Sequence, residues 1–100
     1  MAKGYWIGRI KIDNDAGYQT YAAANPAIFN KFGARIVVRG GKFECPEGES
    51  RARNVVIEFA DYATAVAAYR SPEYQANLKI RQANAVTDLI IIEGYDGPQP

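Results

Sequence analysis

The side chains best suited to chemistry in this sequence are two charged residues in stretches that read as neighbouring strands. Arg39 is followed by Gly40 and Gly41, so a ligand could approach its guanidinium group and the nearby backbone together. A guanidinium group is planar and always charged, which suits a carboxylate or an enolate. Glu58 is expected to be the counter-ion of Arg39 in the empty protein, and to serve as acid or base if burial raised its pKa.

The same charges allow a second interpretation, which the pattern favours. Arg39 and Glu58 are predicted on one face of a sheet together with Arg9 and Glu93. Buried charges need partners, and opposite charges placed across neighbouring strands supply them. These residues would then form an ion-pair network at an interface between subunits rather than a ligand site.

Polar groups also interrupt the apolar faces of the predicted helices, at Tyr21, Asn25, Tyr69 and Tyr74. The simpler explanation is amphipathic packing, with each hydroxyl reaching water or a backbone group. The alternative is a pocket between helix and sheet, for which Tyr21 and Asn25 are secondary candidates after Arg39 and Glu58. Asn25 is the best of the helix residues because a buried amide has to be hydrogen-bonded. Capping a second helix that begins at Pro26 would satisfy it without any ligand.

Several kinds of site are excluded or disfavoured by composition. The chain has no histidine, which removes the usual general base and metal ligand and rules out Ser-His-Asp and Cys-His catalysis. No EF-hand loop or acidic cluster is present, so we expect no metal and no cofactor. Gly40 and Gly41 lack the spacing of a phosphate-binding motif and are read as a β-bulge. Cys45 is predicted in an exposed turn with no nearby cation to activate it.

The elements that must position these residues follow the order β-α-β-β-α-β, the ferredoxin-like arrangement. The pattern predicts four strands, over residues 4–12, 35–44, 54–59 and 86–93. The first helix follows capping residues 13–15, has Pro26 as a kink or a restart, and ends at Gly33. A second helix begins after Asp61, and Ser71-Pro72-Glu73 restarts it as a further segment that reaches about residue 84.

Length and charge bound the class of protein. With 100 residues, we expect a single domain over 1–95 and a loosely ordered tail over 96–100. The net charge is +1 and the cations are scattered, so no nucleic-acid partner is expected. No apolar run approaches a membrane span, so no membrane partner is expected. The single cysteine suits a reducing compartment, and a cytoplasmic location is expected.

The two faces of the predicted sheet indicate a partner. We assign one face to the helices, with Trp6, Ile10, Ile12, Ile36, Val38, Val55, Ile57, Phe59, Ile90 and Ile92. The other face then carries Tyr5, Ile7, Arg9, Val37, Arg39, Phe43, Val56, Glu58, Leu89, Ile91 and Glu93. This second face is more apolar than a solvated sheet face usually is. The sequence therefore predicts a homodimer through the open sheet face.

The chain resembles a known family, the domains of unknown function DUF1330. The matching segments are 4–7, 39–41, 47–48, 53–59, 71–74, Arg81 and 93–94, in the order that the family has them. The resemblance implies a place in the dimeric α+β barrel superfamily, an α+β ferredoxin-like fold that dimerises sheet to sheet. It implies no established reaction.

Two function classes are compatible with these observations. The first is a small dimeric domain that binds or transforms a small anionic or aromatic metabolite without metal or cofactor. The second is a noncatalytic dimeric module for structure or interaction. The superfamily resemblance favours the first, by analogy of fold. A cavity that contains Arg or Glu would support the first class, and a filled core would support the second.

Overall fold

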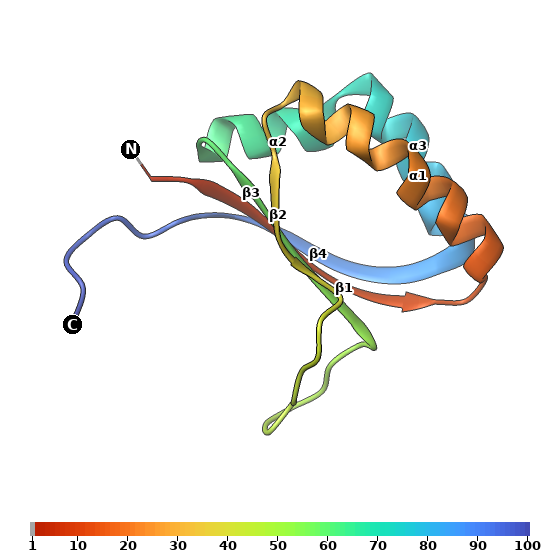
Figure 1. Ribbon diagram of the computed structural model, residues 1–100, viewed down its shortest axis with the longest axis horizontal. Coiled ribbons are helices and arrows are strands. Elements are labelled where there is room, and N and C mark those ends of the chain that lie inside the picture. Colours follow the sequence, from red (N-terminus) through yellow and green to blue (C-terminus); the bar gives the residue numbers. More distant parts are fainter. Residues whose placement is uncertain (1) are drawn as a thin grey trace.

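The computed structural model describes residues 2–100 and has the element order β-α-β-β-α-α-β. Figure 1 shows the three helices together on one side of the sheet, with the loop that joins β2 and β3 extending away from it. The strands are β1 (Gly4–Ile12), β2 (Arg35–Arg39), β3 (Arg53–Phe59) and β4 (Ala85–Glu93). The helices are α1 (Asp15–Lys31), α2 (Tyr62–Arg70) and α3 (Pro72–Asn84).

The helix boundaries follow local capping chemistry. The side chains of Asn14, Asp61 and Ser71 accept from backbone N–H groups at the starts of α1, α2 and α3. Pro72 occupies the first turn of α3, where its missing N–H has no intrahelical partner to lose. Pro26 lies inside α1, which continues through it, so of the two alternatives the restart with Asn25 as a cap is wrong.

The four strands form one antiparallel sheet in the order β2-β3-β1-β4. This order, with both connections that carry helices crossing the same face, confirms the predicted ferredoxin-like α+β fold. Strand β2 ends at Arg39, five residues before the predicted end. Gly40 follows with φ of 62°, a left-handed conformation that favours glycine, and its N–H donates to the Asn54 carbonyl over 2.8 Å.

A bulge in β2 moves Arg39 to the face that the helices cover. Ile36 pairs with Ile57, but Val38 pairs with Val56 and Arg39 with Val55, so the register shifts by one residue between Ile36 and Val38. An inserted residue reverses the side of every later side chain. The predicted faces of Val38 and Arg39 are therefore exchanged. The bulge was expected at Gly40 and Gly41, but it lies earlier in the strand, between Ile36 and Val38.

The predicted faces of β4 are also reversed. Trp6 pairs with Ile91 and Ile10 pairs with Thr87, which places Leu89 and Ile91 under the helices. Ile90 and Ile92 lie on the open face and are 54% and 45% exposed. The run Leu89–Ile92 is apolar at every position, so alternation could not indicate which side faces the core.

The core lies between the helices and the sheet, around Trp6. Its indole ring contacts Phe29, Phe59 and Tyr74 at centroid distances of 5.4, 5.3 and 4.8 Å. The indole N–H donates to the Ala65 carbonyl over 2.8 Å, which ties α2 to the sheet. In the part of the chain that the structure describes, no helix is long and apolar enough to cross a membrane.

Candidate functional site

A cavity of about 110 Å³ lies between α1 and the helix-covered face of the sheet. Its apolar walls come from residues of the sheet and α1, among them Trp6, Ile10, Phe29, Ile36, Val55 and Leu89. Gly8 forms part of the floor, and a Cβ there would lie 3.1 Å from Val55 and 3.3 Å from Leu89. The absent side chain in the middle of the sheet therefore helps to leave room above it.

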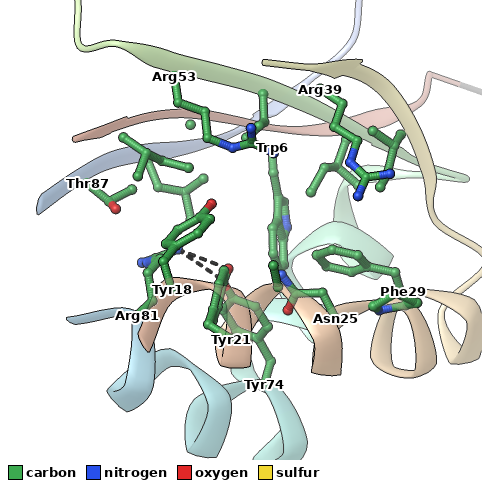
Figure 2. Close-up of a pocket in the computed structure, with 18 residues that line it drawn as sticks. Trp6, Tyr18, Tyr21, Asn25, Phe29, Arg39, Arg53, Tyr74, Arg81 and Thr87 are labelled. Atoms are coloured by element: carbon green, nitrogen blue, oxygen red, sulfur yellow. Dashed lines mark hydrogen bonds between the residues drawn. The ribbon is translucent and has the colours of Figure 1, made fainter. Parts of the chain in front are cut away.

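The polar lining consists of side chains from the sheet and from α1 and α3: Tyr18, Tyr21, Asn25, Arg39, Arg53, Tyr74, Arg81 and Thr87. Figure 2 shows Arg39, Asn25 and Phe29 toward one end of the cavity, and Tyr18, Arg53, Arg81 and Thr87 toward the other. The lining includes no carboxylate, histidine or cysteine. Hydrogen-bond donors therefore dominate the polar groups that a bound molecule would meet.

A buried cluster of Arg81, Tyr74 and Tyr21 joins α3 to α1. Nη1 of Arg81 donates to the Tyr74 hydroxyl over 2.9 Å and to the Tyr21 hydroxyl over 3.4 Å (Figure 2). The two hydroxyl oxygens lie 2.5 Å apart, and either can be the donor. Arg81 is only 6% exposed, yet none of the ion pairs among the described residues involves it.

Burial keeps the phenols of Tyr74 and Tyr18 neutral near pH 7. Burial raises the pKa of Tyr74 far above its usual range, the adjacent Tyr21 adds to this, and the charge of Arg81 opposes it. Burial also raises the pKa of Tyr18, against the charge of Arg53. These tyrosines are therefore hydrogen-bonding groups rather than bases at neutral pH.

Three buried polar atoms of this lining have no hydrogen-bond partner among the described residues. They are Nε of Arg53, Nε of Arg81 and Oγ1 of Thr87. The guanidinium carbon of Arg53 lies 5.9 Å from the centre of the Tyr18 ring. A buried donor without a partner costs free energy, so such groups in a cavity wall indicate a place for an acceptor.

Arg39 lies toward the open side of the cavity. It is exposed, as are the lining residues Ile36 on the same strand and Pro26 on α1, whereas Tyr74 and Arg81 are buried. No ion pair among the described residues involves Arg39. The structure thus places Arg39 at the mouth of the cavity, and not on the open sheet face where the sequence pattern put it.

Glu58 is not the counter-ion of Arg39. It lies on the open face of the sheet, where its carboxylate is 2.8 Å from Nζ of Lys3 and 4.0 Å from Arg35. The hydrogen bond from Lys3 lowers the pKa of Glu58, so this carboxylate is not a raised-pKa acid or base. The predicted pairing failed because the register of β2 places Arg35, and not Arg39, opposite Glu58, and the later bulge turns Arg39 to the other face.

Tyr21 and Asn25 line the cavity as expected for a pocket between helix and sheet. The amide of Asn77 donates to Oδ1 of Asn25 over 2.9 Å and to the Tyr21 carbonyl over 3.1 Å. The side-chain oxygen of Asn25 is therefore satisfied by the protein itself. Tyr74 also lines the cavity, whereas Tyr69 packs against the Trp6 ring at 5.7 Å.

Arg53 and Arg81 were not among the candidates from sequence. A signal for Arg81 exists in the spacing of Tyr74, Leu78 and Arg81, which places a cation on the buried face of α3. For Arg53 the sequence gives no comparable signal, because its strand alternates only weakly between polar and apolar residues.

Comparisons with known proteins agree with this architecture. The model of the family described as "Domain of unknown function (DUF1330)" matches residues 3–95, so the chain belongs to that family. A search among curated proteins finds no match.

Solved structures similar to the chain share its fold at low identity. A protein of unknown function from Rhodopseudomonas palustris is 18% identical with a TM-score of 0.74, over 96% of this chain and 85% of that one. SnoaB, a cofactor-independent oxygenase from Streptomyces nogalater, is 13% identical with a TM-score of 0.64, over 100% of this chain and 97% of that one. A dimeric protein of unknown function with a ferredoxin-like fold from Bacteroides fragilis is 17% identical with a TM-score of 0.60, over 91% and 95%.

Proposed function

We propose that this protein is a homodimer that binds a small anionic or aromatic organic molecule in the cavity beneath α1, without a metal or cofactor. The observation that carries the proposal is the set of three arginines around one cavity, Arg39, Arg53 and Arg81, none of which is ion-paired within the described chain. A purely structural core would fill this space with apolar side chains and would leave no charged donor unpaired.

The size and walls of the cavity support a compact ligand. An apolar cavity of roughly 150 Å³ accommodates benzene, so about 110 Å³ with an open side suits a single ring or a short branched chain. Trp6, Tyr18 and Phe29 supply aromatic walls against which a flat molecule can pack. Arg39 at the mouth would attract an anion and hold its exposed end.

The open sheet face supports the dimer. Val38, Ile90 and Ile92 are 39%, 54% and 45% exposed there, beside the half-buried Ile7 and Val56. One self-complementary apolar face is what a two-fold interface needs. The Bacteroides fragilis protein with the same fold is described as dimeric. A noncatalytic dimeric module is the alternative function, and this apolar face is the observation that favours it.

Transformation of the ligand is a second candidate activity. It is favoured by the Arg81, Tyr74 and Tyr21 cluster, which could stabilise negative charge that develops on a ligand oxygen. SnoaB, which shares the fold, is named as a cofactor-independent oxygenase. The cavity lining offers no carboxylate, imidazole or thiol as a general base, so binding is the primary proposal.

A thermal-shift screen with small carboxylates, phenols and neutral aromatic compounds tests the proposal, because a ligand that binds only the native state raises its melting temperature. The discriminating variant is Ala22→Phe, since Ala22 lines the cavity from α1. The matched control is Ala23→Phe, at the next, exposed position of the same helix. Hits should stabilise wild type and the control but not Ala22→Phe. Hits that bind all three proteins equally, or no hits at all, would overturn the proposed site.

A further inference from the structure

The inner end of the cavity contains more hydrogen-bond donors than the protein has acceptors for. Arg53 and Thr87 both lie beside Ile10, since Ile10 of β1 pairs with Arg53 of β3 on one side and with Thr87 of β4 on the other. The three residues thus form one row across the helix-covered face, and Arg81 in the last turn of α3 lines the same cavity. Figure 2 shows Arg53, Arg81 and Thr87 around Tyr18 at this end.

The guanidinium group of Arg81 has one edge in use and one edge free. Its Nη1 donates to the two tyrosine hydroxyls. Among the described residues its Nε is buried without a partner, and no hydrogen bond involves its Nη2. The edge formed by Nε and Nη2 carries two parallel N–H groups, the arrangement that binds both oxygens of a carboxylate.

The tyrosine pair supplies a further donor. Only one of the two hydroxyl hydrogens can lie between Tyr21 and Tyr74, because a single contact joins the oxygens. Nη1 of Arg81 already donates to both oxygens, so the second hydroxyl hydrogen has to find an acceptor elsewhere. With Nε of Arg53 and the hydroxyl of Thr87, the cavity wall presents several donors without a partner, and two positive charges without an ion pair, among the described residues.

We infer that this inner end, formed by Arg53, Arg81 and Thr87, is a carboxylate subsite. The ligand class is then a monocarboxylate with a flat apolar body, whose carboxylate lies at the inner end. Its body lies over Gly8 against Trp6 and Ile10, and its far end points toward Arg39. A carboxylate accepts up to about four hydrogen bonds and carries the charge that two arginines lack. This inference rests on the proposed function, because it names the class of molecule that occupies the same cavity.

Benzoate and benzamide form a matched pair of probes, because they share a ring and a similar size but differ in charge. Calorimetric or NMR titration at pH 7 should show that benzoate binds wild type at least tenfold more tightly than benzamide. Arg53→Gln should lower the affinity for benzoate at least tenfold and keep the affinity for benzamide within about twofold of wild type. Thr87→Val, which keeps the side-chain shape, should weaken benzoate several-fold. Arg70→Gln, an exposed cation at the end of α2, is the control and should change neither affinity.

The remaining outcomes separate this inference from the proposed function. If benzamide or other neutral compounds bind in the cavity as tightly as benzoate, the ligand site stands and the carboxylate subsite is wrong. If benzoate binds but Arg53→Gln and Thr87→Val have no effect, the carboxylate lies elsewhere and the inference is overturned. If inorganic phosphate displaces benzoate at equal concentration, the site is a general anion site rather than a carboxylate site. Circular dichroism and melting temperature confirm that each variant is folded.

Discussion

Nη1 of Arg81 lies 2.9 Å from the hydroxyl oxygen of Tyr74, which is about two turns earlier on α3, and both side chains are buried. This contact holds a positive charge inside the protein against a neutral phenol instead of a carboxylate. A charge that is solvated only by the hydroxyls of Tyr74 and Tyr21 and by the Tyr21 ring has no opposite charge to compensate it. The arrangement therefore leaves Arg81 available to a charged ligand, while it joins α3 to Tyr21 on α1.

Removal of the Tyr74 hydroxyl should destabilise the protein. Tyr74→Phe keeps the ring that packs on Trp6 but deprives Arg81 of its shorter hydrogen bond. Loss of a buried partner for a charged donor costs about 1–3 kcal/mol. Urea unfolding should show this decrease in the free energy of unfolding. Tyr62→Phe, an exposed tyrosine in α2, should stay within about 0.5 kcal/mol of wild type. An unchanged Tyr74→Phe would contradict the structural role of the cluster.

Thr87→Val is expected to separate stability from ligand binding. The hydroxyl of Thr87 is buried and has no partner among the described residues, so the empty protein gains from its replacement by a methyl group of the same shape. We expect an equal or higher melting temperature together with weaker benzoate binding. A variant that loses several degrees of melting temperature would show that the hydroxyl is satisfied within the folded protein.

Stability should change little between pH 6 and 8 and should fall at both extremes. The chain has no histidine to titrate in the middle range. Hydrogen bonds from Lys3, from Thr64 and from Lys31 lower the pKa values of Glu58, Asp61 and Glu73, respectively. A lowered folded pKa gives stability that is present above the unfolded pKa, near 4, and is lost as pH falls through the folded one.

Above pH 8 the stability should change with pH in the opposite direction. Burial raises the folded pKa of Tyr74 and of Tyr18, so their contribution is complete below the unfolded pKa, near 10, and is lost as pH rises above it. Melting temperatures measured from pH 3 to 11 should therefore form a plateau with two falling edges. Tyr74→Phe should have a shallower alkaline edge than wild type. A large change in melting temperature between pH 6 and 8 would contradict the assignment of the two edges to carboxylates and to buried tyrosines.

The architecture could be predicted from sequence because its signals are local. Asp61, Ser71 and Pro72 set the starts of α2 and α3, and alternation identified β1. The faces of β4 and of the end of β2 could not be predicted. Leu89–Ile92 is apolar on both sides, and nothing in the sequence marks a one-residue bulge between Ile36 and Val38.

The candidate site was predicted only in part for related reasons. Tyr21 and Asn25 were found because polar groups on an apolar helix stripe require an explanation. Arg39 was predicted as a candidate ligand residue and lines the cavity, but it was assigned to the wrong face of the sheet. Arg53 and Arg81 were missed because arginines are mostly exposed, and burial of an unpaired one is a tertiary effect.

The homodimer is tested by a charge on the open sheet face. Val56→Asp places a carboxylate among the apolar groups of β1, β3 and β4, where a dry interface would leave it without a partner. Sedimentation at micromolar concentration should show a dimer of about 22 kDa for wild type, from two chains of 11.0 kDa. The variant should dissociate or unfold. Ala67→Asp, on the exposed side of α2, should remain dimeric. A wild-type mass of one chain would reject the dimer.

Arg39→Gln distinguishes a ligand role for Arg39 from a role in the interface. Arg39 faces the cavity mouth, whereas Arg35, four residues earlier on the same short strand, lies opposite Glu58 on the open face. Both are exposed cations, so Arg35→Gln is a control matched in charge, strand and exposure. We expect Arg39→Gln to remain dimeric and to bind benzoate several-fold more weakly, because it loses a charge at the cavity mouth that attracts an anion.

Arg35→Gln should keep wild-type benzoate affinity, since the only ion pair of Arg35 among the described residues is the 4.0 Å contact with Glu58 on the other side of the sheet. Titration with benzoate and sedimentation on both variants complete the comparison. If Arg39→Gln breaks the dimer and leaves benzoate affinity unchanged, Arg39 is an interface residue. That result would support the ion-pair network, the second interpretation of the sequence. Because the bulge between Ile36 and Val38 turns Arg39 away from the open face, the two variants should differ in ligand binding rather than in assembly.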